Sequence, residues 1–145
     1  MTENYLLDTC VLSEVVSKKP DTDVLSWLGA QIEETLFLSV ITIGEIQKGI
    51  TKLPASKRKA NLERWLKKDL LLRFDTRILP FDTNLLIEWG KITATLAKQG
   101  RILPVIDSFL VATSHYHNLI IVTRNVDNFK GTNINILNIW EKAGQ

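Results

Sequence analysis

The sequence contains a single cysteine among 145 residues, so no internal disulfide can stabilise the fold. Its longest apolar runs, such as residues 119–122, are far shorter than the ~20 residues that a membrane-spanning helix needs. The amino terminus, MTENYLLDTC, has no basic segment before its short apolar run and is therefore not typical of a signal peptide. We expect a protein of the reducing cytoplasm with no membrane partner.

Several common functional motifs are also missing. The glycine-rich nucleotide fingerprints GxGxxG and GxxxxGK[ST] do not occur, and neither does the zinc-protease pattern HExxH. There is no internal repeat, no low-complexity segment and no linker rich in proline, glycine or serine. With 45% hydrophobic and 23% charged residues, the composition is that of a globular protein, and the length predicts one domain over residues 1–145.

Charge is nearly balanced overall but unevenly distributed. The net charge is +2, whereas residues 52–77 hold nine Lys or Arg and three Asp or Glu, a local charge of +6. The remainder of the chain therefore carries −4. This asymmetry indicates a basic patch beside an acidic region.

Apolar segments alternate between strand and helix patterns. Strands are expected over residues 5–7, 36–41, 78–81, 119–122 and 134–140. Helices are expected over residues 9–17, 23–28, 42–50 and 57–70, from 82 or 83 to the glycine at 100, and from 105 to about 117. Strands separated by helices predict an α/β fold with a mainly parallel, about five-stranded sheet and helices on both faces.

Acidic residues gather where the expected strands end. Asp8 directly follows the first strand, and Glu45 and Asp107 each lie in the first turn of an expected helix. Functional sites of such folds lie outside the carboxyl ends of the strands. An all-oxygen cluster suits a hard cation such as Mg²⁺ or Mn²⁺. The polar residues that follow the fourth strand are further candidates: Thr123, Arg124, Asn125 and Asp127.

Each carboxylate also has a purely structural interpretation. Asp8 suits a turn, and Asp107 suits the helix dipole of a first turn. Glu45 forms a capping-box pattern with Thr42, in which its side chain would bond the Thr42 amide. The lone Cys10 lacks a basic partner nearby in sequence and is better explained as a small buried residue than as a nucleophile.

Four segments together resemble the PIN domains of the VapC type, the toxins of type II toxin–antitoxin pairs, with the FitB-like branch the most similar. They are residues 5–14 (YLLDTCVLSE), 39–50 (SVITIGEIQKGI), 102–113 (ILPVIDSFLVAT) and 119–129 (LIIVTRNVDNF). The resemblance implies a three-layer α/β/α fold and a Mg²⁺- or Mn²⁺-dependent endoribonuclease. It also implies a homodimer that is neutralised by a small antitoxin protein.

The resemblance further assigns roles by motif position. It implies that Asp8 and Asp107 are the main metal ligands, that Glu45 is the third acidic residue, and that Thr9 and Thr123 are polar residues near the site. The chain departs from the family at the fourth acidic position. Asn125 and Asn128 stand where many members have aspartate, and Asp127 is one residue early.

The expected reaction is hydrolysis of an RNA phosphodiester by metal-activated water. Lys48, Lys52 and Arg124 are candidates for contacting the RNA backbone. Two alternatives remain. One is a catalytically degenerate domain that only binds RNA or antitoxin. The other is a phosphotransfer enzyme with Asp8 as nucleophile, although Cys10 stands where that pattern requires a second aspartate.

Overall fold

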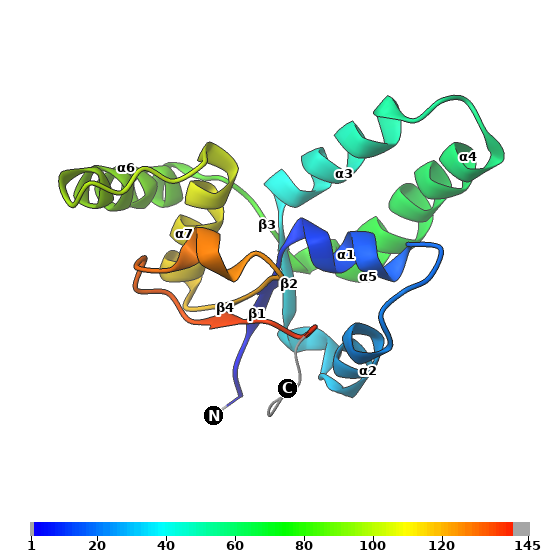
Figure 1. Ribbon diagram of the computed structural model, residues 1–145, viewed down its shortest axis with the longest axis horizontal. Helices are drawn as coiled ribbons and strands as arrows, with labels where there is room; N and C mark the ends of the chain where they lie inside the picture. The colour runs from blue at the N-terminus through cyan, green and yellow to red at the C-terminus, as the bar shows by residue number, and fades with distance from the viewer. Residues whose placement is uncertain (1, 141–145) are drawn as a thin grey trace.

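The computed structural model describes residues 2–140 and contains one parallel sheet of five short strands in the order β3-β2-β1-β4-β5 (Figure 1). The strands are β1 (Tyr5–Leu7), β2 (Leu36–Ser39), β3 (Ile78–Leu79), β4 (Ile120–Val122) and β5 (Ile136–Leu137). Every strand pairing is parallel, as the sequence predicts.

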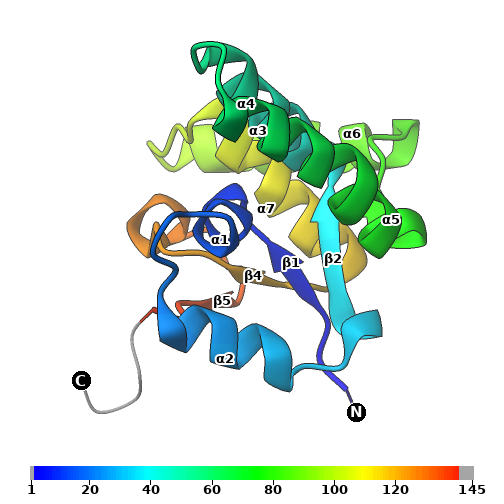
Figure 2. The ribbon, with the colours of Figure 1, turned by 90° about the vertical axis from the view of Figure 1, so that its right-hand side faces the viewer.

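Helices cover both faces of the sheet. They are α1 (Thr9–Val15), α2 (Thr22–Ala30), α3 (Val40–Lys52), α4 (Lys57–Arg64), α5 (Leu71–Phe74), α6 (Thr83–Lys98) and α7 (Val105–His117). In Figure 2, α1 and α2 lie in front of the sheet and α7 lies behind it, while the α3–α4 hairpin rises beyond the strand ends. This is the three-layer α/β/α arrangement that the family resemblance implies.

The core consists of two apolar clusters, one on each face of the sheet. Leu6 and Leu7 are both fully buried, but Leu7 belongs to the cluster under α1, α2 and α3, whereas Leu6 belongs to the cluster under α7. Successive side chains of a strand point to opposite faces, so one short strand can serve both clusters. A strand buried on both faces explains why this segment is continuously apolar.

The order of the strands reverses at β1. The chain proceeds from β1 through β2 to β3 on one side, then crosses to build β4 and β5 on the other. Leu7 pairs with Val122, so the residues after β1 and β4 emerge side by side. Such a topological switch point is where α/β sheets bind their ligands.

The helix expected to begin at Thr42 instead begins at Val40. Ser39 is its N-cap, and its Oγ accepts the Ile41 amide at 3.1 Å. Thr42 therefore lies inside the helix with a buried hydroxyl that has no partner among the described residues, and the predicted capping box with Glu45 is wrong. The strand expected over residues 36–41 is shortened for the same reason.

Other elements also differ from the sequence interpretation, among them the strand expected over residues 78–81, which is only β3. The helix expected over residues 57–70 is α4 followed by a π-helical turn, Trp65–Leu70. The strand expected over residues 134–140 is only β5, because Asn133 takes a left-handed conformation before it and the Asn138 side chain accepts the Trp140 amide after it. Among the described residues, no helix combines the length and apolarity required to cross a bilayer.

An arginine network lies at the amino ends of β2 and β3. Arg77 donates to the backbone carbonyls of Glu33 and Leu36, both at 2.6 Å, and to the Glu33 carboxylate at 2.8 Å. Arg73 donates to both oxygens of the same carboxylate at 2.9 Å. The hydrogen bond from Arg73 is the main reason that the pKa of Glu33 is lowered, and Arg77 adds to it. The network joins the segment before β2 to the segment before β3.

We expect Glu33→Gln to destabilise the fold at neutral pH by about 0.5 kcal/mol, a small value because the carboxylate is partly exposed and screened. A lowered pKa in the folded state contributes stability above the unfolded pKa of about 4.3, and that stability is lost as pH falls through the folded value. Urea unfolding at pH 7 and pH 3 measures the free energy of unfolding of the variant and the wild type, and the loss should appear only at pH 7. The exposed neighbour Glu34 supplies the control, because Glu34→Gln should leave the free energy of unfolding unchanged at both pH values. An equal loss of stability in both variants would contradict the role of Glu33 in the network.

Candidate active site

Asp8 connects the first strand to the first helix. It is the N-cap of α1, and its Oδ1 accepts the Thr9 amide at 2.7 Å. Its Oδ2 accepts the Thr123 hydroxyl, which arrives from the end of β4, at 2.8 Å. Only 7% of Asp8 is exposed, and this burial raises its pKa, while the two hydrogen bonds act in the opposite direction. A buried carboxylate with both oxygens engaged is poorly placed as a phosphotransfer nucleophile.

Glu45 points toward α1. Its Oε1 accepts the Thr9 hydroxyl at 2.5 Å, so Thr9 contacts Asp8 through its amide and Glu45 through its side chain. This contact joins α3 to α1 across the end of the sheet. It also replaces the contact with the Thr42 amide that the sequence pattern suggests.

Asp107 lies in the first turn of α7 and is half-buried. Burial is the main cause that raises its pKa, and the negative charges of Asp8 and Glu45 raise it further. A hydrogen bond from Asn128 lowers it. The charge effects show that the three carboxylates from three separate segments share one electrostatic environment, as the strand-end rule predicts.

The carboxylates do not form a ready-made metal cage. Within residues 2–140, no three Asp, Glu, His or Cys side chains are arranged to hold a metal ion. The electrostatic coupling and this geometric result are compatible, because like charges interact over longer distances than coordination allows. The donor set itself consists only of carboxylate oxygens, which suits a hard divalent cation. Such a cation would also relieve the repulsion that raises the pKa of Asp107.

Thr123 is the buried residue that orders the end of β4. Its hydroxyl donates to Asp8, accepts the Asn125 amide at 3.0 Å and lies 3.6 Å from the Cys10 sulfur. Burial is the main cause that raises the pKa of the Cys10 thiol, and the Asp8 charge adds to it, which argues against a nucleophilic thiolate. The Arg124 guanidinium lies over the Trp140 ring, 5.7 Å from its centroid.

The fourth acidic position is occupied by an amide. Asp127 is 82% exposed and pairs with Lys130 at 2.7 Å, which lowers its pKa. Asn128, one residue later, is the neighbour of Asp107, and its carbonyl accepts the Arg101 guanidinium at 3.1 Å. Sequence reasoning did not identify Arg101, because nothing in its local pattern distinguishes it from a surface cation.

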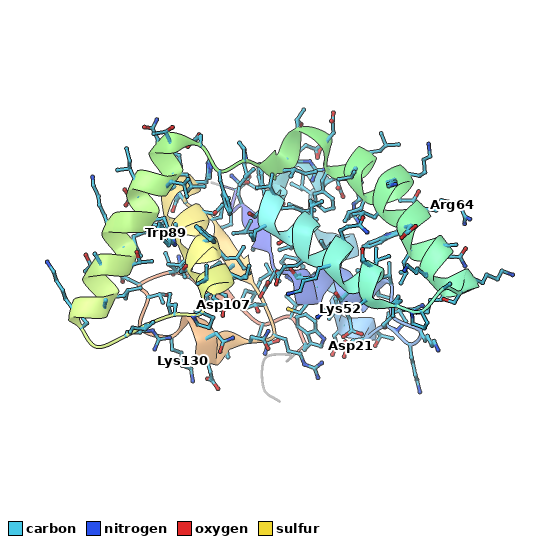
Figure 3. All side chains as sticks on the ribbon, turned by 90° about the horizontal axis from the view of Figure 1, so that it is seen from above. Asp21, Lys52, Arg64, Trp89, Asp107 and Lys130 are labelled. Atoms are coloured by element: carbon cyan, nitrogen blue, oxygen red, sulfur yellow. The ribbon has the colours of Figure 1, made fainter. Side chains whose placement is uncertain are left out.

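A groove beside Glu45 carries two lysines. It has a volume of about 410 Å³ and is lined by Ile41, Gly44, Glu45, Lys48, Gly49, Lys52 and Ile106. Lys48 and Lys52 are one helical turn apart on α3, and neither side chain has an ion pair or hydrogen bond with another described residue. Figure 3 looks onto this end of the sheet, with Asp107 near the start of α7 and Lys52 near the end of α3.

Part of the basic surplus of residues 52–77 is structural. Lys59 donates to the carbonyls of Thr51 and Leu53 at the end of α3, and Arg58 donates to the Val16 carbonyl at 3.2 Å. These cations are therefore used in part to satisfy backbone carbonyls at helix ends. Lys48 and Lys52 remain available to a ligand.

Comparison with known proteins identifies the family of the chain. The PIN domain family model matches residues 5–134. The chain belongs to the PIN-domain family. It is 34% identical to the VapC ribonuclease Y4jK of Sinorhizobium fredii, over 95% of this chain and 99% of that protein. It is 33% identical to the toxin FitB of Neisseria gonorrhoeae, over 93% of this chain and 97% of that protein.

A solved structure supports the same assignment. FitAcB from Neisseria gonorrhoeae superposes with a TM-score of 0.90 at 32% identity, covering 95% of this chain and 99% of the matched chain. The resemblance of this PIN domain to the VapC type and its FitB-like branch is thereby confirmed.

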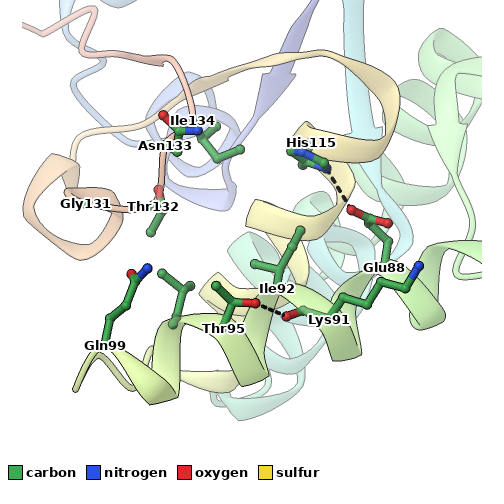
Figure 4. Close-up of a pocket in the computed structure, with 11 residues that line it drawn as sticks. Glu88, Lys91, Ile92, Thr95, Gln99, His115, Gly131, Thr132, Asn133 and Ile134 are labelled. Carbon is green, nitrogen blue, oxygen red and sulfur yellow. Dashed lines mark hydrogen bonds and ion pairs between the residues drawn. The ribbon is translucent and has the colours of Figure 1, made fainter.

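A second cavity of this PIN domain lies away from Asp8, Glu45 and Asp107. It is lined by side chains of α6, the end of α7 and residues 131–134, as Figure 4 shows, and has a volume of about 340 Å³. His115 pairs there with Glu88 at 3.1 Å. It lies at the opposite end of α7 from Asp107. None of Asp8, Glu45 and Asp107 lines this cavity.

The raised pKa of Asp8 gives a stability prediction for the PIN domain. A carboxyl whose pKa is raised by folding contributes stability below its unfolded pKa of about 3.9 and loses it as pH rises through the folded value. Asp8→Asn, which resembles the protonated form, should therefore be more stable than the wild type at pH 7. A gain of about 1 kcal/mol would raise the melting temperature by about 2–4 °C.

Thermal unfolding in EDTA at pH 7 and at pH 3.5 tests this expectation, and the difference should disappear at the lower pH. Asp82, the exposed N-cap of α6, provides the matched control, since Asp82→Asn should leave the melting temperature unchanged. A lower melting temperature for Asp8→Asn at pH 7 would show that the ionised carboxylate stabilises the fold instead.

Proposed function

We propose that this PIN domain is a Mg²⁺- or Mn²⁺-dependent endoribonuclease and the toxin of a type II toxin–antitoxin pair. The observation that carries the proposal is the convergence of Asp8, Glu45 and Asp107 at the carboxyl end of the sheet. The ribonuclease and toxin names of its relatives support the same activity. RNA as the substrate and the lone unpaired cysteine favour the cytoplasm as its location.

Asp8 and Asp107, with Glu45, are the residues that would hold the cation. When bound, a divalent cation supplies a more acidic water and neutralises negative charge that develops on the phosphate. Asp127 is directed to Lys130, and Asn125 and Asn128 are neutral. We therefore favour one metal rather than two.

The remaining residues position these carboxylates. Thr123 fixes Oδ2 of Asp8, and Thr9 fixes Oε1 of Glu45. Oε2 of Glu45 has no partner among the described residues and is the oxygen that we assign to orient the attacking water and accept its proton. No covalent intermediate with a protein side chain is required.

Lys48 and Lys52 are proposed to contact the RNA backbone. Their groove adjoins Glu45, so phosphates next to the scissile bond would meet two unpaired ammonium groups. Arg124 lies against Trp140, whose indole N–H donates to Glu14 and is the main cause that lowers the pKa of that carboxyl. The charge of Arg124 acts on Glu14 in the same direction, so Arg124 is the weaker candidate.

Two protein partners complete the proposal. A hollow of about 180 Å³ between α1, α3 and α4 offers an apolar surface to a helix of the antitoxin. We assign the homodimer interface to apolar side chains that project from α6 and from the segment before α7. Examples are Ile87 and Ile102, and Ile102 is 87% exposed.

A second function is favoured by a specific observation. The amides at the fourth acidic position and the lack of a preformed cage in the described residues suit a degenerate domain that binds RNA or antitoxin without turnover. Metal-dependent cleavage separates the two functions.

The first test is cleavage of total cellular RNA by purified, antitoxin-free protein in Mg²⁺, Mn²⁺ or EDTA. We expect discrete fragments that require metal, and a loss of at least about 100-fold in Asp8→Asn and Asp107→Asn. Asp82→Asn should cleave like the wild type. Cleavage that survives in both site variants would mean a contaminating nuclease. If neither the wild type nor any variant cleaves RNA, the degenerate domain that only binds RNA or antitoxin is favoured.

The lysine groove predicts a separate effect on binding. The double variant Lys48→Gln with Lys52→Gln should raise KM for RNA by about tenfold. It should also reduce the slope of log KM against log salt concentration by about one to two. The kcat of the double variant should equal that of the wild type, because neither lysine contacts a site carboxylate in the structure. Lys98→Gln, at the exposed end of α6, is the control. A wild-type salt slope in the double variant would remove these lysines from the RNA path.

A further inference from the structure

The first turn of α7 carries Asp107 but has no side-chain cap. Its N-cap is Pro104, which has no group that can accept the free amides of the turn. The charges of Asp8 and Glu45 act on Asp107 from the neighbouring segments. Something other than a cap must therefore hold this turn in place.

A tryptophan of α6 contacts the residue that follows Asp107. The Nε1 of Trp89 donates to the Ser108 hydroxyl at 2.9 Å, and that hydroxyl donates to the Val105 carbonyl at 2.5 Å. Ser108 is only 3% exposed, so neither bond competes with bulk water. The hydroxyl thus ties the first turn of α7 to itself and to α6.

The same indole contacts the next residue as well. The rings of Trp89 and Phe109 stack with centroids 5.0 Å apart and an interplanar angle of 23°. Phe109 is also held by Phe81, at 4.9 Å and 33°. Figure 3 labels Trp89, between α6 and α7, and Asp107 near the start of α7. Trp89 therefore restrains both residues that follow Asp107, one by a hydrogen bond and one by stacking.

We propose that Trp89 is a positioning residue for Asp107. Through Ser108 and Phe109 it holds the first turn of α7, so that the Asp107 carboxylate stays beside Asp8 and Glu45. The catalytic consequence rests on the proposed nuclease function, because small displacements of a ligand carboxylate weaken metal binding and turnover. A partly buried indole that merely satisfied its N–H would have no such consequence.

The test is Trp89→Phe, which keeps an aromatic ring against Phe109 and removes the hydrogen bond to Ser108. We expect Mn²⁺ affinity, measured by calorimetry, and kcat to fall together by about threefold to tenfold, with an unchanged KM for RNA. Ser108→Ala should have the same effect, and the double variant should be no worse than either single one. The control is Trp27→Phe, since Trp27 packs edge-on against Tyr5 far from α7.

Wild-type Mn²⁺ affinity and kcat in folded Trp89→Phe and Ser108→Ala would overturn the proposal. If the wild type neither binds Mn²⁺ nor cleaves RNA, the proposed function fails, and positioning is decided on the metal-free protein. There, hydrogen exchange of the Ser108 amide, which bonds the Pro104 carbonyl in the first turn of α7, should become about threefold faster or more in Trp89→Phe but not in Trp27→Phe. Unchanged hydrogen exchange of this amide would overturn the positioning role.

Discussion

The pairing of β1 with β4 is the constraint on which the site depends. Leu7 lies opposite Val122, so the next residues, Asp8 and Thr123, emerge together and their side chains bond. This pairing joins segments that are 115 positions apart in the sequence. The other carboxylates are placed relative to this pair, Glu45 through Thr9 and Asp107 through the start of α7. A change of register would separate all of them.

Concentrating negative charge at one end of a sheet opposes folding, and the remainder of the chain offsets that cost. Burial raises the pKa of both Asp8 and Asp107, so their ionised forms are less favourable in the folded state than in the unfolded chain. Two apolar clusters built on Leu6 and Leu7 hold the sheet from both faces. Hydrogen bonds from Thr9 and Thr123 orient the carboxylates without adding positive charge. Sites that strain their own fold in this way are characteristic of function.

The sequence predicts the parts of the site that depend on strand ends. Asp8 and Asp107 follow or open well-patterned elements, and topology alone brings such positions together. The contact of Glu45 was not predictable, because a capping box and a contact with another helix look identical in the local pattern of Thr42 and Glu45. Ser39 as the actual N-cap decides between them, and that depends on where β2 ends. The contact of Asn128 with Asp107 could not be predicted either, because it joins two segments that are separated in the sequence.

The acidic site lies next to a groove that carries two lysines, and this arrangement bears on the proposed reaction. A phosphate that approached three carboxylates alone would be repelled, whereas Lys48 and Lys52 lie in the adjoining groove and attract it. In the proposed function those lysines would bring the RNA backbone beside the carboxylates but could not neutralise charge that develops at the scissile phosphate itself. In the proposed mechanism that neutralisation falls to the cation held by Asp8 and Asp107. Attraction and turnover are thus assigned to different groups, so substitutions in the groove and at the strand ends should affect different kinetic constants.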